Sequence, residues 1–249
     1  MRTETNTKLV TRNRRFAQYL FFFSLAVLIG AFVFTNQQAL SATPASPDSL
    51  EGTLLLLLPA IVLPVGVIAS MVSVRMTNTW IRQPRPENAL RDGLKGLSNK
   101  SVLYNYYHMP ARHVLICPQG VFAVVTRFQD GHYKVDGDKW QTFGGAFNTF
   151  LRFFRRDGIG NPNEEAQRAA AHVQSLIDPI APGVRVQPVI VFIDPRATVE
   201  INDPAIPVLF PDAKHEHSIT NYLRDIPKDQ RQSLTPNQIQ EFENATLNQ

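Results

Sequence analysis

Two long apolar stretches, residues 16–34 and 54–74, dominate the first third of the chain. Asp48 and Glu51, in the short loop between them, are the only charged residues of the segment 16–74. Each stretch reaches the roughly 20 residues that an apolar helix needs to cross the hydrocarbon core of a bilayer. Soluble helices of this length need a polar face, and these stretches have almost none. The pattern therefore predicts a hairpin of two transmembrane helices.

Basic residues flank this hairpin on its outer sides, whereas its loop contains no Lys or Arg. Short loops rich in Lys and Arg stay on the cytoplasmic side of a membrane. We therefore expect an integral membrane protein with both termini in the cytoplasm and the loop outside. The flanking residues are Arg2, Lys8, Arg12, Arg14 and Arg15 before the hairpin, and Arg75, Arg82 and Arg85 after it.

The first apolar stretch has one alternative interpretation. A basic start and the small residues at 39–45 are also typical of a secretory signal peptide. The apolar core of such a peptide spans about 7–15 residues, and this stretch is longer. A membrane helix is therefore favoured, and cleavage would still leave the second helix as an anchor.

The net charge of the chain reflects its membrane topology more than a nucleic-acid surface. The pI is about 9.3. Without the arm 1–15 and the loop, 20 basic and 18 acidic residues remain, a net charge of +2. Nucleic-acid-binding domains are usually far more basic. Cys117 is the only cysteine, which excludes an intrachain disulfide and a multi-cysteine zinc site and agrees with a reducing cytoplasm.

Residues 75–249 are numerous enough for one domain with its own core. Helical spacing of apolar residues, β-rich runs and turn signals alternate along this part of the chain. They predict a mixed-sheet α/β domain. The expected elements are helices at 87–97, 162–178, 218–226 and from Thr235 onward, and strands at 102–107, 113–116, 121–126, 132–135, 139–143, 184–193 and 208–210. The expected segments are a basic cytoplasmic arm 1–15, the hairpin 16–74, a linker 75–86, the domain 87–227 and a polar tail 228–249.

One part of this domain resembles a known family. The segment 111–127, ARHVLICPQGVFAVVTR, together with Gly131, residues 135–140 and the helix that contains Gln167, resembles the NERD (nuclease-related) domain. That family is similar to the PD-(D/E)xK nucleases, so the resemblance implies a restriction-endonuclease-like fold. It covers roughly residues 87–226, and the hairpin around Gly120 is its most specific part.

The resemblance also implies where a nuclease site would lie, and this chain departs from the family there. The family has an aspartate before the histidine of the first hairpin strand and a Glu-x-Lys on the second, and these places hold Arg112, Val125 and Arg127. Such nucleases hold Mg²⁺ through carboxylates. Arginine cannot bind a cation and valine has no ligand atom. Glu87 and Gln167 match family positions, but one carboxylate makes a poor magnesium site, so we expect a degenerate site without a metal.

Other polar residues are better explained by structure than by catalysis. His113 lies in a strand that we expect to be buried. Asp136 and Asp138 belong to a predicted hairpin turn, where Asp is favoured for backbone reasons. His215 and His217 flank Glu216 near a helix start, and we expect them to be solvated.

In the segment 143–156, apolar residues, most of them phenylalanines, recur at helical spacing, and three arginines fall on another side of the same predicted helix. This pattern is typical of an amphipathic helix at a bilayer surface, and equally of a helix packed on the domain core. A nucleic-acid contact is a third interpretation. The contact residues predicted here are Phe147, Phe150, Phe154, Arg152, Arg155 and Arg156.

The sequence thus predicts a membrane-anchored, cytoplasmic NERD-like domain that has lost catalysis and acts in binding or scaffolding. The expected partners are the lipid bilayer and either a nucleic acid or a protein, and no cofactor is expected. The alternative is an active metal-dependent nuclease that uses Mg²⁺ held by substitute carboxylates such as Glu87 and Asp130.

Overall fold

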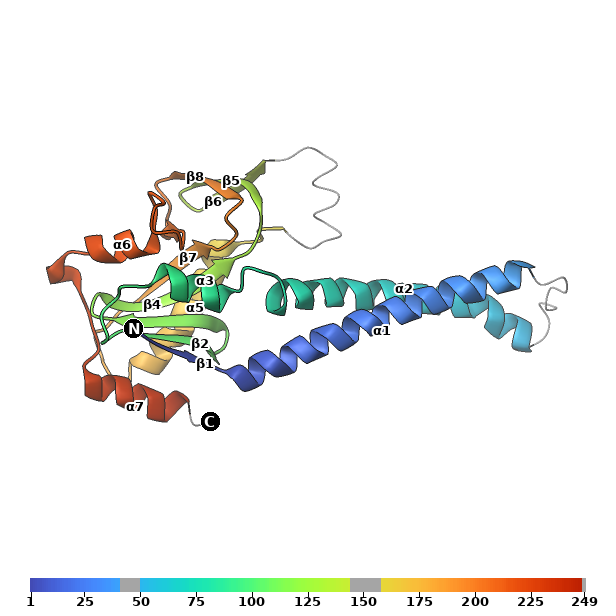
Figure 1. The fold of residues 1–249 in the computed structure, drawn as a ribbon, viewed down its shortest axis with the longest axis horizontal. Coiled ribbons are helices and arrows are strands. Elements are labelled where there is room, and N and C mark those ends of the chain that lie inside the picture. Colours follow the sequence, from blue (N-terminus) through green and yellow to red (C-terminus); the bar gives the residue numbers. More distant parts are fainter. Residues whose placement is uncertain (41–49, 144–157, 248–249) are drawn as a thin grey trace. The chain divides into compact units, whose positions relative to one another are not determined.

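The computed structural model describes residues 1–40, 50–143 and 158–247 (Figure 1). These residues form two compact units. One unit contains Val10–Arg82, and the other combines Met1–Leu9 with most of the chain from Gln83 onward. We describe each unit by itself.

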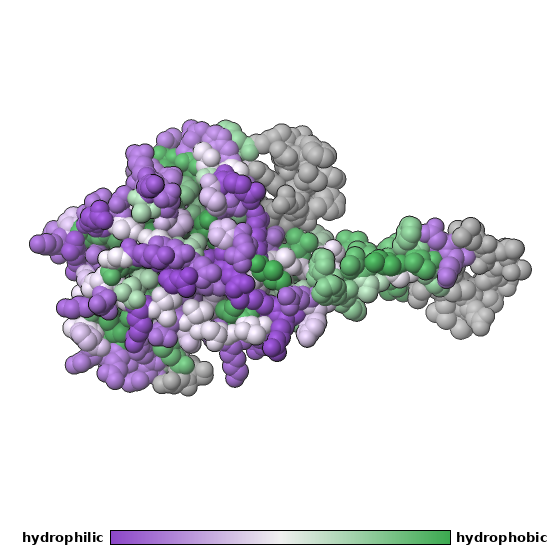
Figure 2. Space-filling model, viewed as in Figure 1, coloured by the Kyte–Doolittle hydropathy of each residue, from purple (hydrophilic) through white to green (hydrophobic). Residues whose placement is uncertain are grey.

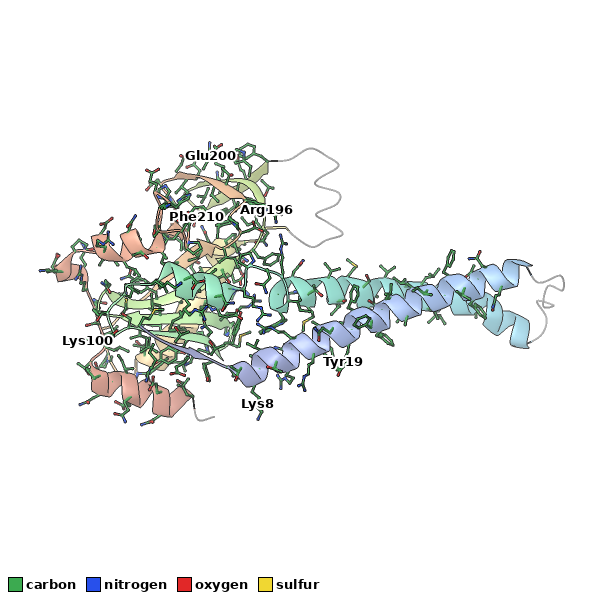
Figure 3. The ribbon with its side chains drawn as sticks, viewed as in Figure 1. Lys8, Tyr19, Lys100, Arg196, Glu200 and Phe210 are labelled. Atoms are coloured by element: carbon green, nitrogen blue, oxygen red, sulfur yellow. The ribbon has the colours of Figure 1, made fainter. Side chains whose placement is uncertain are left out.

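Two long helices, α1 (Thr7–Leu40) and α2 (Leu50–Trp80), form the first unit. Both are long and apolar enough to span a membrane, over Thr7–Gln37 and Ala60–Trp80. Between their polar ends, most of their outward-facing side chains are apolar, as the green surface over the helices in Figure 2 shows. Tyr19, labelled in Figure 3, is 71% exposed. Such an apolar exterior is stable in lipid and costly in water.

The two helices approach each other closely at Gly66. A methyl group at this position would lie 2.9 Å from Cδ2 of Leu28 and 3.2 Å from Cγ1 of Val27. Small residues at such contacts allow membrane helices to pack tightly. At the other end of the pair, the Arg14 guanidinium donates a hydrogen bond to the carbonyl oxygen of Trp80 (2.9 Å).

A six-stranded mixed sheet forms the centre of the second unit, in the order β1-β2-β3-β4-β7-β9. Strand β3 runs antiparallel to both β2 and β4. The pairs β1–β2, β4–β7 and β7–β9 are parallel. Their bounds are β1 (Arg2–Thr5), β2 (Val102–His108), β3 (Ala111–Cys117), β4 (Gly120–Arg127), β7 (Val186–Phe192) and β9 (Val208–Leu209). A smaller sheet has the order β6-β5-β8, with β5 (Gly131–Asp136), β6 (Lys139–Phe143) and β8 (Ala197–Asn202).

Helices cover both faces of the larger sheet, which explains why its central strands are apolar throughout. Alternate residues of β3 face opposite sides: Val114 packs with helix α5 (Pro162–Ile177), and Leu115 packs with helix α3 (Pro86–Gly93). Helix α7 (Pro236–Thr246) joins the α5 side through Phe242, and helix α6 (Ile219–Asp225) joins the α3 side. A 3-10 turn (Lys228–Gln230) lies between α6 and α7.

The observed elements confirm the predicted mixed-sheet α/β architecture and most of its elements. Asn161 caps α5, Ser218 caps α6, and Pro86 begins α3, as the sequence indicates. Helix α3 was expected to reach residue 97, but it ends at Gly93. Any side chain at this position would lie within 3 Å of Pro211.

Three features differ from the sequence-based expectation. Part of the expected basic arm forms strand β1, and β8 was not expected at all. Helix α7 was expected from Thr235 onward as part of a polar tail outside the domain, but a capping box at Thr235 fixes it and its Phe242 is completely buried. Phe242 pairs edge-on with Tyr104 at 5.7 Å between ring centroids, and this contact helps to attach α7 to the domain.

Candidate functional site

The hairpin β3–β4 brings together the three positions where the resemblance places nuclease ligands. His113 pairs with Val124 in the antiparallel register, so Arg112 lies beside Val125 on neighbouring strands. Val125 packs in the core cluster that contains α5, and the Arg127 guanidinium contacts α5 directly. The side chains of a strand alternate between faces, so Arg112, Val125 and Arg127 share the α5 face of the sheet.

Arg127 is a buried cation with incomplete hydrogen bonding. Its side chain is 10% exposed, and Nη1 forms an ion pair with Oε2 of Glu165 on α5 (3.0 Å). Among the residues that the structure describes, Nε and Nη2 have no hydrogen-bond partner. Burial lowers the pKa of Arg127, and the charge of Arg112 lowers it further, whereas Glu165 opposes both effects. Buried donors without a partner are rare in folded proteins, and a bound anion or an ordered water is one way to satisfy them.

Arg112 adds a second positive charge beside Arg127. Its side chain is half-buried, and within the described part of the chain it forms no ion pair. Val125 is 6% exposed and contributes only apolar surface. The face that the resemblance assigns to metal ligands therefore carries two positive charges, and among the described residues Glu165 is the carboxylate paired to it.

Glu87 lies on the other side of the sheet, in a separate network. Its Oε2 accepts a hydrogen bond from the hydroxyl of Tyr106 (2.9 Å), and the Tyr106 ring meets His113 edge-on at 5.0 Å. Nδ1 of His113 pairs with Oδ1 of Asn105 (2.8 Å). Complete burial lowers the pKa of His113 to about 3, with a smaller contribution from Arg112, so this histidine is neutral. The expectation that His113 is a core residue is confirmed.

Tyr106, whose hydroxyl donates to Glu87, has an unusual backbone conformation. Its φ of 64° lies in the left-handed region, which residues with a Cβ rarely adopt. The β2–β3 pairing shifts register between Asn105 and His108, and this bulge contains Tyr106. Gln167 is exposed on α5, away from this network.

A second acidic group lies where β4 and β7 end. Asp194 is 3% exposed and accepts hydrogen bonds from the backbone amide, Nε and Nη2 of Arg196. Nη2 of Arg196 also forms an ion pair with Oδ2 of Asp130 (2.8 Å). Arg196, labelled in Figure 3, thus neutralises both carboxylates. Within the described ranges, no group of three His, Cys, Asp or Glu residues is arranged to hold a metal ion.

The remaining candidates are spread over the domain. Asp136 and Asp138 flank the β5–β6 turn, and Oδ1 of Asp138 accepts a hydrogen bond from Asn163 (2.9 Å). His215 is half-buried rather than fully solvated, because its ring stacks on Phe210 at 3.8 Å. The residues Phe147, Phe150, Arg152, Phe154, Arg155 and Arg156 lie outside the described residues.

Sequence reasoning missed Glu165, Asn105 and Tyr106. Glu165 is one of two adjacent acidic residues in the first turn of α5, a pattern that the helix dipole alone explains. Asn105 and Tyr106 stand in an apparently regular strand, and no sequence signal marks the bulge.

The domain thus has an α/β fold in which the antiparallel hairpin β3–β4 lies between the short helix α3 on one face of the sheet and the longer helix α5 on the other. Residues 85–193 match the family model of the nuclease-related domain (NERD). No curated protein and no solved structure matches the chain.

Proposed function

We propose that the chain is a membrane-anchored NERD domain that binds nucleic acid through phosphate at the Arg112–Arg127 face and does not cleave it. The observation that carries this proposal is the placement of two arginines on one face of the hairpin: Arg112 is half-buried and forms no ion pair among the described residues, and beside it lies the buried Arg127, whose Nε and Nη2 find no acceptor there either. Guanidinium groups bind phosphate oxygens through paired, charge-assisted hydrogen bonds. Phosphate contacts of this kind position a protein on nucleic acid without reading its sequence.

The same residues argue against metal-dependent cleavage. Metal-assisted phosphate hydrolysis needs carboxylates that hold Mg²⁺ next to the scissile phosphate. Two arginines and a valine supply none, and Glu165 is engaged by Arg127. The substitute carboxylates are also engaged, because Glu87 accepts a hydrogen bond from Tyr106 and Asp130 pairs with Arg196.

An experiment on the full chain in nanodiscs of zwitterionic lipid separates these functions. Fluorescence anisotropy with labelled single-stranded and duplex DNA should show binding in EDTA that weakens as salt rises, because phosphate contacts release counterions. Arg112→Gln should weaken binding about fivefold to tenfold, which corresponds to the loss of about one charged hydrogen bond. The matched control is Arg91→Gln, which removes an exposed arginine from α3.

Gel analysis of the same mixtures with Mg²⁺ tests catalysis. Intact DNA supports a binding domain, and Mg²⁺-dependent cleavage that is abolished by Glu87→Gln or Asp130→Asn establishes the alternative nuclease. Equal DNA binding by Arg112→Gln and the unmodified chain contradicts the phosphate site.

We also propose that α1 and α2 anchor the domain in the bilayer, with both termini in the cytoplasm. The contacts of strand β1 support this arrangement. β1 pairs with β2 from Arg2↔Val102 to Thr5↔Asn105, and Arg2 forms an ion pair with Glu243. Chain segments before α1 and after α2 thus belong to one folded unit, which supports placing both on one side of a membrane. Cleavage of the first helix as a signal peptide would remove β1 from this sheet.

A further inference from the structure

A pocket of about 660 Å³ lies at the opposite end of the β3–β4 hairpin from Arg112 and Arg127. Its walls come from the β3–β4 turn, the start of β1, the loop before β2 and the helix α7 with its preceding segment. The volume is within the range of about 300–1,000 Å³ that is typical of small-molecule sites. Arg2 and the α7 residues that line the pocket lie outside residues 85–193, the segment that matches the nuclease-related family model.

We propose that this pocket binds a small organic monoanion, a carboxylate with a compact apolar body. The apolar part of the pocket is formed by residues such as Ile116, Leu234 and Ile239, which would cover an aryl or branched alkyl group. The charged residues that line it are Arg2, Lys100 and Glu243. Their sum is one positive charge, which fits one carboxylate.

The internal pairing in the pocket leaves one cation for the ligand. Oε1 of Glu243 accepts hydrogen bonds from Arg2 and from the hydroxyl of Tyr104 (2.6 Å). This arrangement neutralises Glu243 and fixes α7 to the edge of the sheet. Lys100, labelled in Figure 3, is exposed two residues before β2 begins, and it has no ion pair in the part of the chain that the structure describes. We assign the carboxylate of the ligand to its ammonium group.

The ligand is selected by both of its parts. An ammonium–carboxylate contact at a half-open pocket is weak alone, because water and salt screen it. Burial of an apolar body next to it adds affinity in proportion to the area removed from water. A free inorganic anion lacks the second contribution, and a neutral amide of the same shape lacks the first.

Ligand-observed NMR on the full chain in nanodiscs tests the site, with empty nanodiscs as the blank. The probes are phenylacetate, its neutral analogue phenylacetamide, and inorganic phosphate as a competitor. Phenylacetate should bind saturably, phenylacetamide about tenfold more weakly, and phosphate should compete poorly. The variant Lys100→Gln should weaken phenylacetate about tenfold, to the level of the amide. Lys95→Gln, which removes another exposed lysine, should have no effect.

A second variant fills the pocket instead of changing its charge. Gln240→Trp places a large ring at an exposed position of α7 that lines the pocket, and Asn237→Trp places the same ring on α7 outside the lining. Binding should be lost only in Gln240→Trp, with both variants melting as the unmodified chain does. Equal affinity for phenylacetate and phenylacetamide, displacement by phosphate alone, or unchanged binding in Gln240→Trp would each overturn the proposal.

Discussion

Nη1 of Arg127 and Oε2 of Glu165 form an ion pair at 3.0 Å that joins the end of strand β4 to the first turn of helix α5. The guanidinium is buried and the carboxylate is half-exposed, so the pair holds a desolvated cation against a partly solvated anion. Within the described ranges, this ion pair is the contact that compensates the positive charge on the Arg112–Arg127 face. Its removal should therefore have opposite effects on stability and on phosphate binding.

The first prediction concerns the variant Glu165→Gln. It should lower the free energy of unfolding by about 1–2 kcal/mol, because Arg127 loses a charged partner while it stays buried. It should also strengthen DNA binding severalfold, because a competing anion is gone. Chemical denaturation and anisotropy measure the two effects.

The matched control is Glu164→Gln, one residue earlier in the same helix turn. Glu164 pairs with Arg168 on the exposed surface (2.6 Å). Its loss should cost no more than about 0.5 kcal/mol and should leave DNA binding unchanged. If the two variants behave alike, the Arg127–Glu165 pair does not govern the site.

The second prediction concerns acid stability and His113. Burial lowers the pKa of His113 to about 3, whereas the unfolded chain has a pKa near 6.5. Below that value the unfolded state takes up a proton that the folded state does not, so stability is full above about pH 6.5 and falls as pH drops. From pH 7 to 5, His113 should contribute a loss of about 2 kcal/mol. In denaturation series, His113→Gln should show a shallower pH dependence, and an unchanged slope would contradict a neutral, buried His113.

The third prediction tests the loss of metal ligands by restoring them. Mg²⁺ should not raise the melting temperature of the unmodified chain beyond the effect of NaCl at equal ionic strength. The triple variant Arg112→Asp, Val125→Glu, Arg127→Lys restores the acidic pattern that the resemblance implies. Mg²⁺ at 100 times its Kd should stabilise that variant by about 2.7 kcal/mol. Specific stabilisation of the unmodified chain would mean that other carboxylates bind the metal.

The β3–β4 hairpin and the helices of the α/β domain were predictable because their sequence signals are local. The Pro118–Gly120 turn between two apolar runs indicates the β3–β4 hairpin, and Asn161 followed by Pro162 indicates the start of α5. Strand β1 has no such signal. Its four residues are polar, and its partner β2 lies about a hundred residues further along the chain, so only the folded structure reveals the pairing.

The candidate site was predictable in its residue types but not in its contacts. The resemblance alone places Arg112, Val125 and Arg127 on one hairpin. It does not show that Arg127 is buried, that Glu165 partners it, or that two of its donors lack an acceptor among the described residues. These facts depend on how α5 packs over the sheet, which long-range contacts determine.

The last prediction concerns the topology of the membrane hairpin. Cys117 is the only cysteine, and burial raises its pKa to about 11, so Cys117→Ala gives a background that is free of thiols. Single cysteines are then introduced at Arg2, Ser46 or Gln249 and exposed to a membrane-impermeant maleimide. The cysteine at Ser46 should react in intact cells, because the loop between two spans with basic outer flanks lies outside. The cysteines at Arg2 and Gln249 should react only after permeabilisation, because β1 pairs with β2 of the domain that we propose to be cytoplasmic. Reaction of the Arg2 and Ser46 cysteines on the same side would show that α1 does not span the membrane, and the reversed pattern would place the domain outside.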